Sequence, residues 1–209
     1  PGTNKFRDRF AGGKNGHGPT NMIDELMIGI DPHHMIDGCQ QILVTGWPFR
    51  GPFSLVDHEG RPVTQDSFKG RFMLVYFGYT WCPDVCPVDV LVLGQAVEML
   101  GQVGDQVQPL FITVDPARDR PQALKDYVSH FHPRLIGLTG AESEIRAVAK
   151  AYRIHRRKVV LADSAGPDDY LVDHASITHL MGPDGKHVTL FPHGTDAERM
   201  AEVLRRYLP

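Results

Sequence analysis

Two cysteines four positions apart are the residues of this sequence best suited to chemistry. Cys82 and Cys86 stand in the run GYTWCPDVCP, residues 78–87, and each of them precedes a proline. A thiolate is both a nucleophile and a soft metal ligand, so the pair indicates a redox centre or a site for Cu(I) or zinc. With three cysteines in the chain, a disulfide framework is excluded. An inert buried pair is the alternative, but proline-flanked cysteines make poor core residues.

The spacing of the pair favours a shared metal ion over a stable disulfide. Residues four apart on a regular helix keep their Cβ atoms about 5–6 Å apart, whereas an unstrained disulfide needs about 3.5–4.5 Å. A disulfide between Cys82 and Cys86 would therefore be labile and open to exchange. Pro87 suits the first position of a helix, so we expect Cys86 at or beside the N-cap, where the helix dipole lowers the pKa of its thiol.

A metal ion held by two thiolates needs a third donor, and eleven histidines compete for that role. His174 ends the segment DYLVDH, residues 169–174, just before a predicted strand, and His179 lies within that strand. From spacing alone the two rings are equivalent candidates. For the other histidines we expect exposed or core positions.

The elements that must position these side chains follow from the hydrophobic pattern. Residues 72–77 and 110–114 are apolar runs of strand length, typical of strands buried on both faces. The residues on either side of the turn PDGK predict an antiparallel hairpin of 177–181 and 187–191. Apolar residues at helical spacing predict helices at 87–100, 121–131, 142–152 and 196–208, with Asp119 and Ser143 as the start signals of the second and third.

Alternating strands and helices predict an α/β fold. We expect a thioredoxin-like mixed sheet flanked by helices, with a C-terminal β-hairpin and a final helix. The cysteine motif lies between the first buried strand and its helix, which is where α/β sheets place their chemistry.

Composition limits the domain count and the partners. The chain has 209 residues, of which 42% are hydrophobic, as in a globular domain. We expect an N-terminal extension or linker at 1–48 and one thioredoxin-like metal-binding domain at 49–209. With a formal net charge of −3 and dispersed basic residues, the sequence has no basic cluster of the kind that binds nucleic acid. No stretch approaches 18 apolar residues, and the chain opens with Pro1. We therefore expect that the chain was processed or truncated from a longer precursor, so that an anchor would not be visible in it.

Four motifs in order resemble the Sco (SenC/PrrC) family of copper chaperones for cytochrome oxidase. They are YFGYTWCPDVCP at 76–87, TVDPARD at 113–119, DYLVDH at 169–174 and GPDG at 182–185, and the resemblance covers residues 51–208. It implies copper, as Cu(I), Cu(II) or both, bound by Cys82, Cys86 and His174. Two positions depart from the family pattern: Ala175 replaces a small hydroxyl residue, and Arg120 interrupts an Arg-Asp-Thr-Pro sequence.

The resemblance also implies partners and a place in the cell. We expect a monomer tethered to a membrane and facing an extracytoplasmic space, the bacterial periplasm at the inner membrane or its equivalent, the mitochondrial intermembrane space. The expected partner is the copper-site subunit of cytochrome c oxidase or another protein that transfers copper or thiols.

Three functions remain open at this point. One is a copper chaperone that is not an enzyme, and another is a thiol–disulfide oxidoreductase that uses Cys82 and Cys86 as a redox-active pair to reduce a client's cysteines. The third, a thiol peroxidase, is the weakest, because that chemistry centres on one activated cysteine. A reductase needs only the dithiol, so His174 discriminates between the first two.

Overall fold

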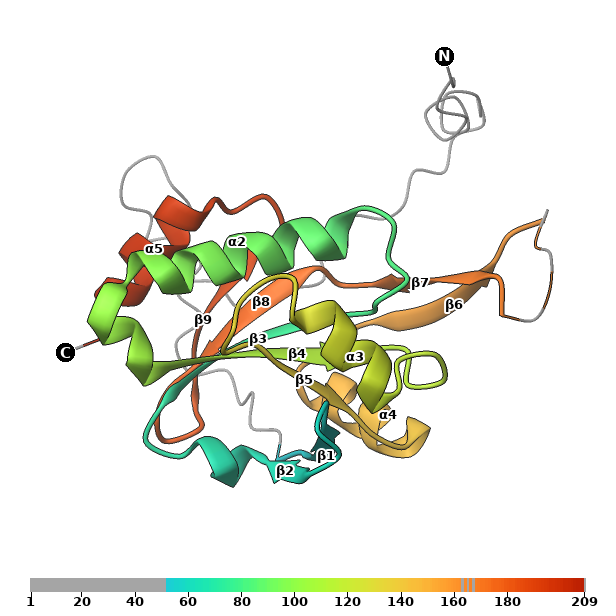
Figure 1. Ribbon diagram of the computed structural model, residues 1–209, viewed down its shortest axis with the longest axis horizontal. Helices are drawn as coiled ribbons and strands as arrows, with labels where there is room; N and C mark the ends of the chain where they lie inside the picture. Colours follow the sequence, from blue (N-terminus) through green and yellow to red (C-terminus); the bar gives the residue numbers. More distant parts are fainter. Residues whose placement is uncertain (1–51, 163, 165, 167, 209) are drawn as a thin grey trace, which may run out of the picture. The chain divides into compact units, whose positions relative to one another are not determined.

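The computed structural model describes residues 52–162, 164, 166 and 168–208 (Figure 1). The expected extension at 1–48, its boundary and Cys39 lie outside the described residues. No helix in the described part of the chain is long and apolar enough to cross a membrane.

The centre of the fold is a seven-stranded mixed sheet in the order β2-β1-β5-β4-β3-β8-β9. Its three central strands, β5, β4 and β3, are parallel, and antiparallel strands flank them on both sides. The buried apolar runs of the sequence form β3 and β4, as predicted. The strands are β1 (Ser54–Asp57), β2 (Pro62–Thr64), β3 (Phe72–Gly78), β4 (Val107–Thr113), β5 (Ile136–Thr139), β8 (Ile177–Met181) and β9 (His187–Pro192).

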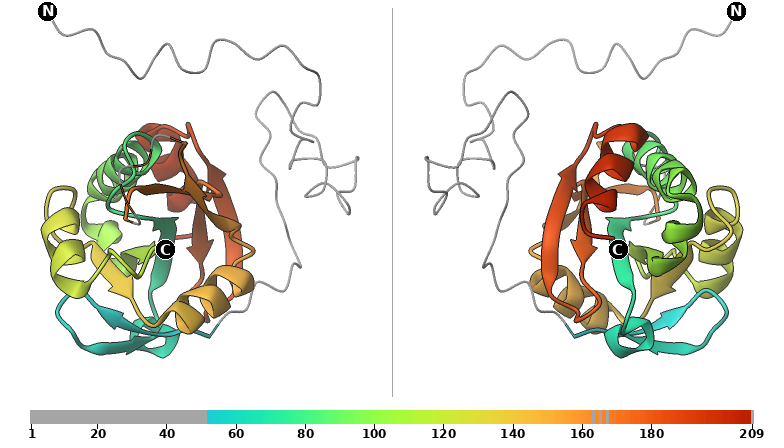
Figure 2. Two further views of the ribbon diagram at one scale, coloured as in Figure 1. Left: turned by 90° about the vertical axis from the view of Figure 1, so that its right-hand side faces the viewer. Right: turned by 90° about the vertical axis from the view of Figure 1, so that its left-hand side faces the viewer.

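Helices cover both faces of this sheet (Figure 2). The helices α2, α3 and α5 share one face, where the ring centroid of Tyr127 in α3 lies 5.2 Å from that of Phe111 in β4. The helix α4 lies on the other face, where Tyr152 packs 5.2 Å from Phe77 of β3. The bounds are α2 (Val85–Met99), α3 (Pro121–Val128), α4 (Glu142–Ala151) and α5 (Ala197–Arg205), with short 3-10 helices η3 (Gln65–Phe68) and η4 (Gly101–Gln106).

The fold class is the predicted one, and α3 and α4 begin at residues 121 and 142 as predicted, but the two predicted capping residues are wrong. The residues that cap α3 and α4 are Arg120 and Ala141, not Asp119 and Ser143. Asp119 is fully buried and bonds to other segments, as described below. In α4 the Glu144 side chain accepts a hydrogen bond from the amide of Ala141. A residue of the first turn therefore satisfies the backbone of the capping residue.

A second, two-stranded sheet was not predicted from the sequence. It pairs β6 (Arg156–Val160) with β7 (Tyr170–His174) and extends beyond the main sheet (Figure 1). The β6 strand is mostly exposed and begins with the basic residues Arg156, Arg157 and Lys158, so it lacks an apolar face. In β7 only Tyr170 and Val172 are buried. This sheet carries His174 at the end of β7.

The buried His179 makes stability depend on pH. It lies on the face of the sheet that α4 covers, beside Tyr152 and with Nδ1 3.4 Å from Nε2 of His187. Burial lowers its pKa to about 3, whereas an unfolded histidine titrates near about 6.5. The unfolded chain therefore binds more protons between these values, and the fold loses stability as pH falls below 6.5.

We expect the His179 ring to contribute about 2 kcal/mol of this loss between pH 7 and pH 5. Urea unfolding of the reduced protein at both pH values measures it. The variant His179→Leu should show a smaller loss, whereas His130→Gln, which removes an exposed ring, serves as the matched control. An unchanged pH dependence in His179→Leu would contradict the assignment.

Candidate metal centre

The two cysteines lie where the central strand β3 passes into the helix α2. Cys82 is half-buried in the connecting loop, and its amide donates to the carbonyl of Tyr79 at 3.2 Å. Cys86 is the second residue of α2 and is fully buried. Gly78 ends β3 beneath it, and a Cβ atom there would lie 2.8 Å from Tyr76, 2.9 Å from Phe111 and 3.1 Å from the Cys86 sulfur. The close approach of helix and strand thus requires glycine.

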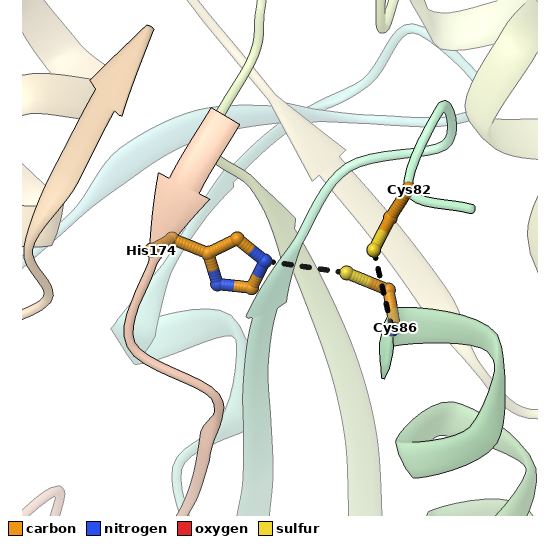
Figure 3. A group of neighbouring side chains, drawn as sticks. All are labelled: Cys82, Cys86 and His174. Carbon is orange, nitrogen blue, oxygen red and sulfur yellow. Dashed lines mark hydrogen bonds between the residues drawn. The ribbon is translucent and has the colours of Figure 1, made fainter. Parts of the chain in front are cut away.

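His174 reaches the cysteines from the end of β7 (Figure 3). Its Nε2 lies 3.3 Å from Sγ of Cys86, and its ring packs edge-on against Tyr79 at 5.8 Å. Its Nδ1 lies 3.1 Å from the carbonyl oxygen of Ala175. Because a carbonyl can only accept, Nδ1 carries the proton, and in the neutral ring Nε2 has its lone pair free for a metal ion.

Among the described residues, Cys82, Cys86 and His174 form a group that could hold a metal ion. One ligand atom from each lies within 4.8 Å of the others. His179 lies on the opposite face of the sheet and takes no part, so the choice that spacing left open falls on His174. Two sulfur donors and one imidazole nitrogen make a soft set that suits Cu(I) or zinc and leaves room for a further ligand.

The two thiols differ strongly in acidity. Hydrogen bonds from the Cys86 thiol and from the amides of Asp84 and Cys86 hold the pKa of Cys82 well below its usual range. The amide of Cys86 lies 3.4 Å from the Cys82 sulfur. The hydrogen bond to Cys82 and burial both raise the pKa of Cys86. The prediction that Cys86 is the acidic thiol is therefore wrong, because the start of α2 directs its amide at the sulfur of Cys82.

A buried carboxylate fixes the loop that carries Cys82. Asp119 accepts hydrogen bonds from the amide of Thr80 at 3.0 Å, from its hydroxyl at 2.7 Å and from the hydroxyl of Thr113 at 2.6 Å. These bonds tie the cysteine loop to the end of β4. Sequence reasoning missed this role because the segment 113–119 also fits an ordinary strand-to-helix turn.

A second network joins the cysteine helix to the segment that follows His174. Asp89, one turn after Cys86, accepts from the Ser176 hydroxyl at 3.1 Å and lies 2.9 Å from Nδ1 of His193. The Ser176 hydroxyl is also 2.9 Å from the hydroxyl of Tyr76. No role in this network was predicted for these residues, because they lie in four separate segments of the chain.

Comparison with known proteins places this site in a family. The model of the SCO1/SenC family matches residues 45–209. The chain is 42% identical over 158 residues to Protein sco1 of Schizosaccharomyces pombe and 40% identical over 158 residues to a SCO2-like protein of Rickettsia conorii. The chain belongs to the SCO1/SenC family.

The coverage of these relatives is uneven. The alignment with the S. pombe protein covers 75% of this chain and 60% of that protein. The alignment with the Rickettsia protein covers 74% of this chain and 75% of that protein. This chain thus spans about 60% of the length of the curated relatives that it matches first.

Solved SCO1/SenC structures share the fold. Bradyrhizobium japonicum ScoI with copper bound is 42% identical, with a TM-score of 0.69 over 76% of this chain and 99% of that one. Arabidopsis thaliana ScoI with copper bound is 38% identical, with a TM-score of 0.71 over 76% of this chain and 97% of that one.

The departures from the SCO1/SenC pattern leave the site intact. Residue 175 contacts His174 through its backbone carbonyl, which alanine supplies as well as a hydroxyl residue does. Arg120 is exposed and caps α3 with extended backbone. The two aromatic residues before Cys82 differ in burial: Tyr79 is buried, whereas Trp81 is 65% exposed.

We expect reduced, metal-free protein to be alkylated at Cys82 first. Because the thiolate form of Cys82 is stabilised, its reaction with iodoacetamide should remain fast down to about pH 6, where an ordinary thiol is almost fully protonated. Mass spectrometry of peptides from timed reactions measures both cysteines. Faster labelling of Cys86 would contradict the order of acidities.

We expect Gly78→Ala to push α2 away from β3. Forcing a methyl group into this packed contact costs about 1–3 kcal/mol, and it should displace Cys86 as well. The measurement is denaturant unfolding of the reduced protein. Gly166→Ala is the control, because a Cβ atom there meets nothing within 4 Å. Equal stabilities of the two variants would show that the contact at Gly78 is not tight.

Proposed function

We propose that this protein is a copper chaperone that holds one copper ion between Cys82, Cys86 and His174. The observation that carries the proposal is the convergence of these three donor atoms within 4.8 Å. Two thiolates suit Cu(I), and the imidazole adds the nitrogen donor that Cu(II) prefers. The copper-bound structures of two relatives from the same family support the choice of metal.

The client is the copper-site subunit of cytochrome c oxidase, and kinship with the SCO1/SenC family supports this part of the proposal. The protein works as a monomer in an extracytoplasmic space, tethered by an anchor. Relatives named as mitochondrial support a compartment equivalent to the intermembrane space or the periplasm.

The burial of the two cysteines supports an order in which the ligands release the metal ion. Cys82 is the accessible donor, whereas Cys86 is fully buried. An incoming client thiolate can therefore displace Cys82 first, and Cys86 and His174 then release the ion. The exposed ring of Trp81 beside Cys82 lies where such a client would dock.

The difference between the two thiols also favours a second function, thiol–disulfide exchange. The Cys82 thiolate attacks one sulfur of a client disulfide and forms a mixed disulfide, releasing one client thiolate. Cys86 loses its proton and attacks the Cys82 sulfur, which releases the second client thiolate and leaves a Cys82–Cys86 disulfide.

We expect reduced protein to bind one copper ion per chain and the oxidised protein to bind almost none, because thiolate sulfur is the ligand. Titration with a competing chelator and metal analysis measures the stoichiometry. The variant Cys39→Ser should leave it unchanged, since the proposed site uses the other two cysteines. Full loading of the oxidised form, or a halved stoichiometry in Cys39→Ser, would refute the assignment.

We expect His174→Ala to separate the two functions. Cu(II) should lose more affinity than Cu(I), which two thiolates can hold alone. Thiol exchange with a model disulfide should persist, while metallation of a copper-accepting client fails. The control is His155→Ala, which removes an exposed ring just before β6, the strand that pairs with β7. Unchanged Cu(II) binding in His174→Ala would remove this residue from the site, and loss of exchange alone would favour the reductase.

A further inference from the structure

Arg118 lies between the two segments that carry the metal donors. Its guanidinium carbon is 3.7 Å from the ring centroid of Tyr170, the first residue of β7, and 5.5 Å from that of Trp81. Trp81 directly precedes Cys82, and Tyr170 begins the strand that ends at His174. One cationic side chain therefore contacts both sides of the site without touching a donor atom.

Hydrogen bonds fix Arg118 in this place. Its Nη1 donates to the backbone carbonyls of Asp168 at 3.1 Å and Tyr170 at 3.0 Å, and its Nε donates to Asp115 Oδ2 at 2.5 Å. The other carboxylate oxygen of Asp115 accepts from the Tyr170 hydroxyl at 2.8 Å. Asp115 is fully buried and the Arg118 side chain is 10% exposed. We call Asp115, Arg118 and Tyr170 the Arg118 clasp.

The position of the strand β7 depends on these hydrogen bonds. It belongs to the two-stranded sheet and pairs with β6 alone, outside the hydrogen bonds of the main sheet. The β6 strand is itself largely exposed, so it offers little buried surface to hold its partner. Charge-assisted hydrogen bonds in a buried setting are strong and directional. The clasp thus supplies β7 with a link to the end of β4, beside the Asp119 network that holds the cysteine loop.

We propose that Arg118 is a positioning residue for His174. By fixing the start of β7, it sets how closely the imidazole approaches the two thiolates. Because Cu(II) depends on the nitrogen donor more than Cu(I) does, the clasp determines the affinity for Cu(II) relative to Cu(I). This inference rests on the proposed copper function and assigns to it a residue that lies between β4 and α3, 52 positions before Tyr170 at the start of β7.

The test compares Arg118→Met with Arg134→Met. Arg134 makes bonds of the same kinds, from Nη1 to the carbonyl of Gly104 at 2.8 Å and to Asp105 at 3.1 Å. These partners lie in η4, before β4 begins, whereas the metal donors lie beyond the other end of that strand. The Arg134 variant therefore controls for the loss of a structural arginine away from the site.

Competition titrations of each variant with Cu(II) and Cu(I) give the first readout. We expect Arg118→Met to weaken Cu(II) binding by about tenfold or more, as for a lost charged hydrogen bond, and Cu(I) binding by a clearly smaller factor. Electron paramagnetic resonance of bound Cu(II) should show an altered nitrogen coupling. Arg118→Lys should recover part of the affinity, since lysine keeps the charge but not the planar fork, and Arg134→Met should match the wild type.

Hydrogen exchange in the copper-free, reduced protein gives a second readout. The amides of residues 170–174 should exchange faster in Arg118→Met, while those of β4 keep the wild-type rate. Tyr170→Phe, which removes only the hydrogen bond to Asp115, should shift the same amides in the same direction and keeps the test decisive if Arg118→Met does not fold.

Equal losses of Cu(II) and Cu(I) affinity in the Arg118 variant, or unaltered exchange at 170–174, would overturn the positioning role. A wild-type protein that binds no copper would instead refute the proposed function. In that case the exchange measurement still decides whether the clasp holds β7.

Discussion

The contact between the Cys86 thiol and the His174 ring joins residues 88 positions apart, and the surrounding structure serves to maintain it. Cys86 is fixed by the packing of α2 on β3, where Gly78 lets the sulfur approach the strand. His174 has no such support from the main sheet, because it ends a strand of the small outer ladder. Buried polar groups supply what the hydrophobic core cannot: the carboxylates of Asp119 and Asp115 hold the cysteine loop and β7 to the end of β4. Such groups are stable in the interior only when their hydrogen bonds are satisfied.

The unequal cysteines give this centre two chemical abilities from one geometry. The half-buried Cys82 is held as a thiolate, which in the proposed function makes it the first residue that a metal ion or a client sulfur meets. The fully buried Cys86 is kept protonated until a metal ion or a disulfide bond takes the place of its proton. In the proposed function, copper binding and thiol exchange compete for the same pair, and the imidazole of His174 is the group that distinguishes them.

Sequence patterns predicted the parts of the fold that depend on burial. The strands β3 and β4 were expected because each is a continuous apolar run, and the helices that follow them because their apolar residues recur at helical spacing. The β6–β7 ladder was missed, since it is half-exposed and is held by Arg118, which lies 50 and 52 positions before the two residues whose carbonyls it contacts. The cysteines were found from their motif, but only family resemblance selected His174 over His179. The order of the thiol acidities was predicted wrongly, because it depends on which sulfur the first amides of α2 face.

X-ray absorption at the copper edge tests the central claim most directly. Copper-loaded, reduced protein is predicted to show two sulfur neighbours and one nitrogen neighbour of imidazole type around a single metal ion. The same measurement on His174→Ala is predicted to retain both sulfur neighbours and to lose the imidazole signal. A copper environment without sulfur, or an imidazole signal that survives the substitution, would contradict the account.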